Sequence, residues 1–157
     1  MGVGVSNANH DKGAKAERDV AKYLSAWWPQ ARRALGAGRK DDRGDIHGVP
    51  YTVVQVKDCE ALRLPKWVQQ TSQQRANEGA PFCLLVVKKK YKTVGQWDAY
   101  VPAWLLTDLT LDESEAWTWF RMDLALAVVV LERQIVMHAA AERASRSLRS
   151  LRTTVST

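Results

Sequence analysis

One continuous apolar run constrains the fold of this chain more than any other stretch. Residues Pro81 to Val87 read Pro-Phe-Cys-Leu-Leu-Val-Val, without a charged or amide side chain. Side chains of a strand alternate between its two faces, so an unbroken apolar run is typical of a strand that is buried on both faces. We therefore expect this segment to be a central strand of a sheet.

The segments around this run predict further strands and helices. Tyr51 to Val56 is rich in strand-forming residues and is preceded by Gly48 and Pro50. A helix is expected from near Pro65 to Gly79, because proline is favoured at the start of a helix and glycine just past its end. Other elements are expected in the second half of the chain: a hairpin tip at 88–92, a strand at 97–101, a short helical piece at 102–106, an acidic loop at 108–115 and a small strand at 117–120. The pattern favours an α/β fold.

Both ends of the chain are expected to carry a helix. Residues 1–10 are small and polar and are predicted to be a flexible N-terminus, with a helix from near Asp11 or Lys12 to Pro29. Asp123 is a good N-cap for a long C-terminal helix whose apolar stripe begins at Leu124. At 157 residues the chain has the size of one domain. We expect a core at 11–122, with the helix and basic tail at 123–157 belonging to the same domain.

Charge and cysteine content point to an intracellular protein with an anionic partner. The net charge is +6, which favours nucleic acid. Cys59 and Cys83 have no CxxC spacing and are predicted to be reduced thiols, not zinc ligands. No secretory signal is visible in the N-terminal residues. The apolar run Leu124 to Leu131 is far shorter than the ~20 residues of a membrane span. We expect a cytoplasmic protein (host cytoplasm if it is viral) that does not contact a membrane.

A polar pair at the end of the predicted 51–56 strand is a candidate site. Gln55 and Lys57 share one face of that strand by alternation. A lysine at the end of a valine-rich strand needs an anion, and Asp45 can supply it if the two segments pair as a hairpin. An acid, an amide and an ammonium group together would suit a metal ion and a phosphate. The alternative is a strand that simply runs out into solvent at Gln55.

A second acid lies on the inward stripe of the first predicted helix. Glu17 precedes Val20 and Ala21 by three and four residues, so it projects from the same face. A carboxylate on that face needs a metal, a cation or a backbone amide as its partner. The alternative places Glu17 at the edge of the stripe, in water or paired with Arg18 or Lys22.

Basic residues gather in two places where phosphates can bind. Cations interleave with glycines between residues 30 and 44, and four lysines follow the central strand at 88–92. The alternative in both places is a solvated loop. The candidate contacts to a DNA backbone are Lys12, Arg33, Arg39, Lys40, Arg43, Lys88, Lys89, Lys90 and Lys92.

Several of these residues lie in recognisable motifs. They are Lys12-Gly13-Ala14-Lys15-Ala16-Glu17-Arg18, Arg33-Ala34-Leu35-Gly36-Ala37-Gly38, Gly44-Asp45-Ile46 and Val53-Val54-Gln55-Val56-Lys57. In this order they resemble the PD-(D/E)xK nuclease superfamily and, within it, the archaeal-type Holliday junction resolvases. With further similarity at Phe82 to Lys90 and Tyr100-Val101-Pro102, the resemblance covers most of residues 12–106.

The resemblance implies a fold, an activity and a site. The fold is a restriction-endonuclease-like mixed central β-sheet flanked by helices, and the activity is Mg²⁺-dependent cleavage of four-way DNA junctions by a homodimer, with Mn²⁺ as a substitute. Glu17, Asp45, Gln55 and the backbone carbonyl of Val56 would hold the metal, and Lys57 would act on the reacting phosphate. The alternatives are another nuclease of the superfamily (a nickase, or a flap- or end-acting enzyme) and a branched-DNA-binding protein with weakened catalysis.

One departure from the family pattern affects the metal site. The family usually carries glutamate where this chain has Gln55. An amide carbonyl can still ligate a hard cation, but one negative charge is lost. Weaker metal binding is therefore expected.

Overall fold

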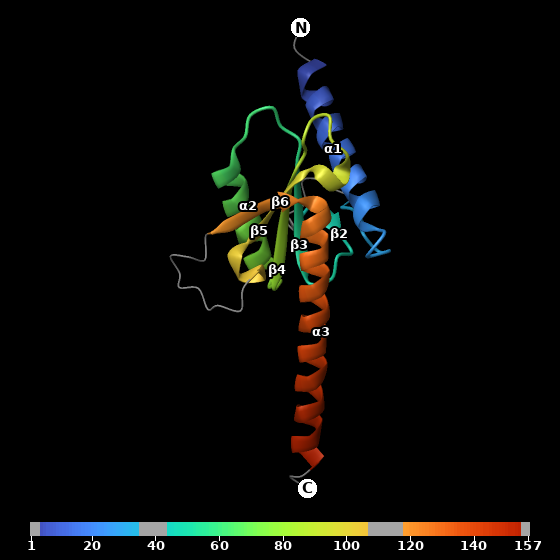
Figure 1. Cartoon of the computed structure of the whole chain (residues 1–157), viewed down its shortest axis with the longest axis vertical. Helices are drawn as coiled ribbons and strands as arrows, with labels where there is room; N and C mark the ends of the chain where they lie inside the picture. The colour runs from blue at the N-terminus through green and yellow to red at the C-terminus, as the bar shows by residue number, and fades with distance from the viewer. Residues whose placement is uncertain (1–3, 35–43, 107–117, 155–157) are drawn as a thin grey trace.

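The structure is a computed structural model that describes residues 4–34, 44–106 and 118–154. Within these ranges, six strands form one mixed sheet in the order β1-β2-β3-β4-β5-β6 (Figure 1). The elements in chain order are α1 (Gly4–Leu24), β1 (Arg32–Arg33), β2 (Ile46–His47), β3 (Thr52–Lys57), α2 (Leu64–Glu78), β4 (Phe82–Val87), η1 (Val94–Gln96), β5 (Asp98–Pro102), η2 (Ala103–Leu105), β6 (Trp119–Asp123) and α3 (Leu124–Thr154).

The centre of the sheet is the parallel pair of β3 and β4. The two strands are in register from Thr52 opposite Phe82 to Lys57 opposite Val87, and α2 connects them. All six residues of β4 are buried, which confirms the predicted central strand. All other neighbouring strands pair antiparallel, so the sheet is mixed.

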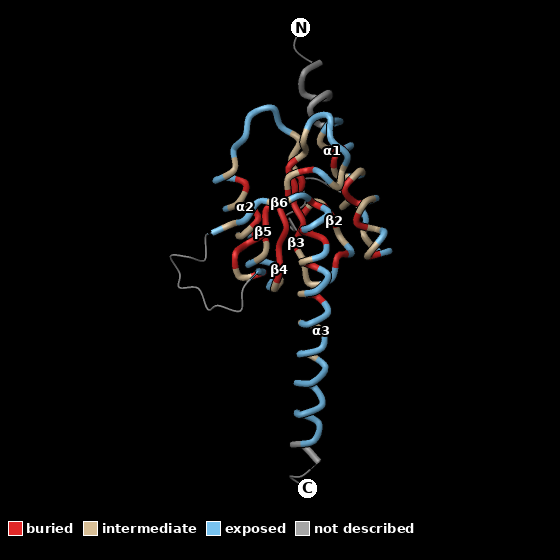
Figure 2. Tube along the Cα trace, viewed as in Figure 1, coloured by how far each residue is buried: buried red, intermediate tan, exposed pale blue. Residues whose placement is uncertain are grey.

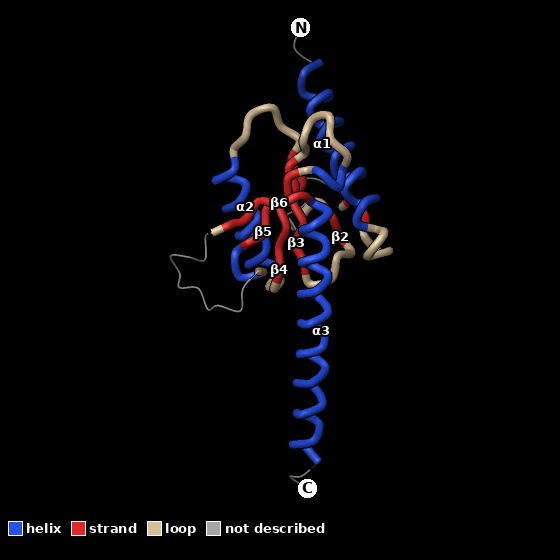
Figure 3. Tube along the Cα trace, in the orientation of Figure 1, coloured by secondary structure: helices blue, strands red, loops and turns tan. Residues whose placement is uncertain are grey.

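Helices cover both faces of the sheet (Figure 3). On one face, Val54 and Val56 of β3 pack in a cluster with residues of α1 and α3, such as Leu24 and Leu131. On the other face, Trp67 of α2 packs with residues of β4 and β5. The predicted α/β class, with a mixed sheet flanked by helices and a long C-terminal helix, is confirmed.

Three predicted boundaries differ from the structure. α1 begins at Gly4, not near Asp11, because a helix held by tertiary packing extends readily through neighbouring residues that contain no proline. It ends at Leu24, and turns lead from there to Pro29. The predicted strand at 117–120 is instead β6, which runs to Asp123 because it pairs with the whole of β5. The predicted acidic loop at 108–115 lies outside the described residues.

The length of α3 changes one expectation. The run Leu124 to Leu131 is short, but the 31-residue helix continues with few charges. By length and composition alone, Leu124–Leu151 meets the requirement for a membrane span, although 28% of its most apolar window is buried in the fold. The core helices of soluble proteins meet the same requirement, so this observation does not assign a location.

The burial of β4 predicts unequal reactivity of the two thiols. Burial raises the pKa of Cys83 to about 12, whereas Cys59 is exposed. A thiol attacks reagents as its thiolate, so a thiol-specific disulfide reagent at pH 8 should label one cysteine per native chain and two per denatured chain. Cys59→Ser should remove the rapidly labelled site. Rapid native labelling of that variant would mean that β4 is not a central strand.

Candidate functional site

A tight bend places Asp45 beside the end of β3. Gly44 has a φ of +88°, and a Cβ atom there would lie 2.8 Å from the Val54 carbonyl oxygen, so a larger residue would not fit without strain. The backbone N–H of Asp45 donates to that same carbonyl at 2.8 Å. The Asp45 carboxylate accepts a hydrogen bond from the Val56 N–H, with an Oδ2–N distance of 2.7 Å. The predicted approach of Asp45 to this strand is confirmed.

The contact with Asp45 also orients the backbone of Val56. β2 pairs with β3 at Ile46 and Val54, so beyond that point the Val56 N–H bonds a carboxylate and not a strand. The N–H and C=O groups of one strand residue leave the strand on the same edge. The Val56 carbonyl therefore faces the edge where Asp45 lies, as a backbone metal ligand would have to.

Gln55 and Lys57 lie on the sheet face that α2 covers. In the parallel register they are next to Leu85 and Val87, whose side chains pack with Trp67 of α2. Gln55 is only 1% exposed, and Lys57 is half-buried. The alternative in which β3 runs out into solvent at Gln55 is wrong. Asp45, Gln55, Val56 and Lys57 thus share one end of β3.

Glu17 has a different partner from the one that a metal site requires. It comes from α1, which covers the opposite face, and its carboxylate forms an ion pair with Arg33 of β1. The two side chains are 20% and 25% exposed, respectively. The alternatives of a solvent-exposed Glu17 and of a pair with Arg18 or Lys22 are therefore wrong. Arg33, predicted to contact DNA, is the cation that pairs with Glu17.

The donor set fits a hard cation in part. No cluster of three His, Cys, Asp or Glu side chains occurs within residues 4–34, 44–106 and 118–154. The predicted ligands include only two carboxylates, with the remaining oxygens from Gln55 and Val56, and oxygen ligands suit Mg²⁺. Asp45 and the Val56 carbonyl lie together, and Gln55 follows on the same strand. The second carboxylate, that of Glu17, is paired with Arg33.

A basic groove of about 690 Å³ lies beyond the ends of β3 and β4. Three parts of the chain meet there: α1, the connection from β3 into α2, and the hairpin between β4 and β5. Lys12, Lys88 and Lys90 line it as predicted cations, but sequence reasoning missed Arg63 and Lys66. These two cations lie on either side of Leu64 and Pro65 at the start of α2. Their closeness to the start of this helix was the only sign of them in the sequence.

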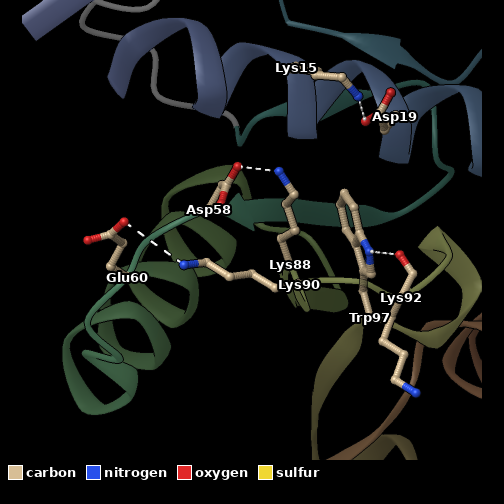
Figure 4. A network of polar contacts seen from close by, with 8 residues as sticks. All are labelled: Lys15, Asp19, Asp58, Glu60, Lys88, Lys90, Lys92 and Trp97. Carbon is tan, nitrogen blue, oxygen red and sulfur yellow. Dashed lines mark hydrogen bonds and ion pairs between the residues drawn. The ribbon is translucent and has the colours of Figure 1, made fainter. Parts of the chain in front are cut away.

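Acidic residues partly neutralise the hairpin lysines (Figure 4). The Lys88 ammonium lies 2.6 Å from Asp58 and 5.8 Å from the centre of the Trp97 ring. The Lys90 ammonium lies 3.9 Å from Glu60, and its side chain is 68% exposed. Lys90 is therefore more available than Lys88 to a phosphate in this groove.

The remaining predicted DNA contacts do not line the groove or are not described. Lys89 pairs with Asp98 at 3.3 Å. The Lys92 carbonyl accepts a hydrogen bond from the Trp97 indole, and Figure 4 shows the Lys92 ammonium directed away from the Lys88–Asp58 pair. Arg39, Lys40 and Arg43 lie outside the described residues.

Known proteins provide no independent guide to this site. Comparison of the chain with protein-family models, with curated proteins and with solved structures finds no match. Its function must therefore be inferred from the residues themselves.

Proposed function

We propose that this chain is a metal-dependent, structure-selective DNA endonuclease of the restriction-endonuclease-like fold that cleaves four-way junctions. The observation that carries the proposal is the position of Asp45, whose carboxylate is bonded to Val56 at the end of the strand that bears Gln55 and Lys57. The order of elements also supports it. An acid-bearing helix, an acid at a bend, a strand ending in Lys57, a helix and a buried strand follow one another as the resemblance implies.

The residues of the site have separate roles in phosphodiester hydrolysis. Asp45 is the metal anchor, with the Val56 carbonyl on the same strand edge as a second oxygen ligand. Mg²⁺ bound there would lower the pKa of a coordinated water and offset charge on the phosphate. Lys57 stabilises that charge or orients the attacking water.

The groove binds the phosphate backbone of the DNA and does not contact base edges. Lys12, Arg63, Lys66 and Lys90 line a depression at the same end of the sheet as the site. Ammonium and guanidinium groups bind phosphates of any sequence, so recognition would follow the shape of the DNA. Such binding weakens strongly as salt rises.

Two observations favour a second candidate, a branched-DNA-binding protein with weakened catalysis. Gln55 stands where the family usually carries a glutamate, and the Glu17 carboxylate forms an ion pair with Arg33. Both reduce the negative charge available to a metal. The groove is compatible with either candidate.

Cleavage of synthetic DNA tests the proposal directly. The purified chain should cut a four-way junction in Mg²⁺ or Mn²⁺, leave the component duplex largely intact, and be inactive in EDTA. Tight junction binding without cutting in either metal would favour the second candidate. Equal cutting of junction and duplex would indicate another nuclease of the superfamily.

A further inference from the structure

The C-terminal part of α3 extends beyond the body of the protein (Figure 1). The helix is tied to the sheet as far as Glu142, which accepts a hydrogen bond from the Tyr51 hydroxyl at 2.9 Å. His138, one turn earlier, packs edge-on against Tyr51 and Phe82. Every residue from 143 to 151 is exposed, as Figure 2 shows along this segment. An isolated helix as short as the segment from residue 143 to Thr154 is marginal in water, and the body of the protein does not pack against residues 143–151.

An apolar stripe runs along α3 on a side that the body does not cover. We call it the outer stripe. Its large members are well exposed: Leu126 by 54%, Met137 by 50%, Leu148 by 63% and Leu151 by 62%. Its members are Leu126, Val130, Met137, Ala141, Ala144, Leu148 and Leu151.

The spacing of the outer stripe is that of a helix-pairing seam. From Met137 onward its members alternate steps of four and three residues, the period that keeps apolar side chains facing a second helix. At roughly 100° per residue the stripe lies on the far flank from Leu124 and Leu131, which face the sheet. One helix thus carries two apolar faces, and the sheet covers only the first.

Charge is arranged so that a copy of the same helix can approach. Arg143, Arg146 and Arg149 lie on the side of the helix away from the outer stripe. The positions that border the stripe in the extension include Ser145 and Ser147, which are neutral. Arg133 lies in line with the stripe between Val130 and Met137, so the pairing is confined to the part from Met137 to Leu151. There, two identical stripes can meet while Arg143, Arg146 and Arg149 remain in water.

We propose that the outer stripe is a self-association surface on which a second copy of this chain docks, so that two α3 helices form a short coiled coil. The interface is isologous, because the same stripe faces itself. The extension of α3 points away from the β3–α2 connection that lines the basic groove (Figure 1), so the groove stays open in the dimer. The proposal does not depend on the nuclease assignment.

A bilayer is a poorer occupant of the same face. A spanning helix must place all its sides in hydrocarbon, and the extension carries Arg143, Arg146 and Arg149. Arginine side chains are costly there, whereas pairing of two stripes leaves them hydrated. Lipid binding is nevertheless the competing outcome that the experiment has to separate.

Sedimentation equilibrium of the full chain tests the proposal. The parent protein should dimerise in the micromolar range, and high salt should not dissociate it, because the seam is apolar. Leu148→Glu should raise the dissociation constant by about 100-fold or more, since it places an unpaired charge in the seam. Ser150→Glu adds the same charge outside the stripe and should leave the constant nearly unchanged. Both variants should keep the cooperative unfolding of the body, because neither residue is part of the core.

Cysteine crosslinking gives a second readout that does not depend on affinity. In a Cys59→Ser background, which removes the exposed native thiol, Ala144→Cys should form a disulfide-linked dimer under mild oxidation. Arg146→Cys, on the arginine side, should not. A parent protein that stays monomeric at high micromolar concentration would overturn the proposal. So would a monomer that co-sediments with phosphatidylcholine–phosphatidylglycerol vesicles through Leu148, since lipid would then be the occupant.

Discussion

An Asp45→Asn protein should cleave a four-way junction about 10³-fold more slowly than the parent chain while binding the junction equally well. The asparagine oxygen can still accept the hydrogen bond from the Val56 N–H, so the bend and the strand end should survive. The charge that anchors the metal is lost, and a loss of about 4 kcal/mol of transition-state stabilisation corresponds to that rate. Single-turnover cleavage in Mg²⁺, with junction binding measured in EDTA, checks both halves of the expectation.

Asp19→Asn is the matched control for that experiment. Asp19 is also an acid near this end of the molecule, but its partner is Lys15 on the same helix, at 2.6 Å. Exposed pairs of this kind contribute little, so its loss should change neither stability nor cleavage much. Parental cleavage by Asp45→Asn would remove the nuclease proposal, whereas equal losses in the two variants would indicate a general effect of charge.

A Gln55→Glu protein should be destabilised by about 3 kcal/mol or more at pH 7 in EDTA and should regain much of that stability in Mg²⁺. Gln55 is 1% exposed, so the new carboxylate would be desolvated unless a cation binds it. A metal that binds only the folded chain stabilises it by mass action. Chemical denaturation with and without Mg²⁺ measures the difference.

The pH dependence of the same variant has a definite sign. Burial raises the pKa of a carboxyl group above its unfolded value of about 4.3. Below that pH both states bind the proton, and Gln55→Glu should be nearly as stable as the parent. As the pH rises from there, the folded state holds the proton longer than the unfolded state, so the free energy of unfolding falls. The loss levels off above the raised pKa of the folded state.

The chain offers a matched control for the metal response. Gln74 of α2 is also a buried glutamine, 4% exposed, and its side-chain amide atoms have no hydrogen-bond partner among the residues that the structure describes. Gln74→Glu should be destabilised in the same way, but Mg²⁺ should not restore its stability because no ligand set is predicted around it. If Mg²⁺ restored both variants equally, or neither, Gln55 would not be part of a metal site.

Much of the fold could be predicted because single segments carry their own constraints. The apolar run at 81–87 is buried on both sides wherever a sheet forms, and proline and glycine mark both ends of α2. The strand of Gln55 and Lys57 could likewise be predicted, because its residues favour strands. The start of α1 was not, because a helix end depends on how far packing sustains the helix.

The candidate site was predictable in its residues but not in all of its pairings. Glu17 was recognised as an inward acid that needs a partner, yet nothing local identifies Arg33, sixteen residues further on, as that partner. Lys88 similarly meets Asp58, which lies thirty residues away along the chain. The outer stripe is a different case, because its period stands in the sequence, but only the structure shows that the sheet leaves it exposed.

The sequence by itself determined the longer helices and strands, their order and the strand face on which Gln55 and Lys57 lie, because side-chain periodicity and backbone restrictions act within a few residues. The short strands β1 and β2 were not predicted. The tertiary structure decided which charges meet and which apolar face stays uncovered. Ion pairs and burial depend on distances between segments far apart in the chain, and only packing of α1, α2 and α3 on the sheet sets those distances.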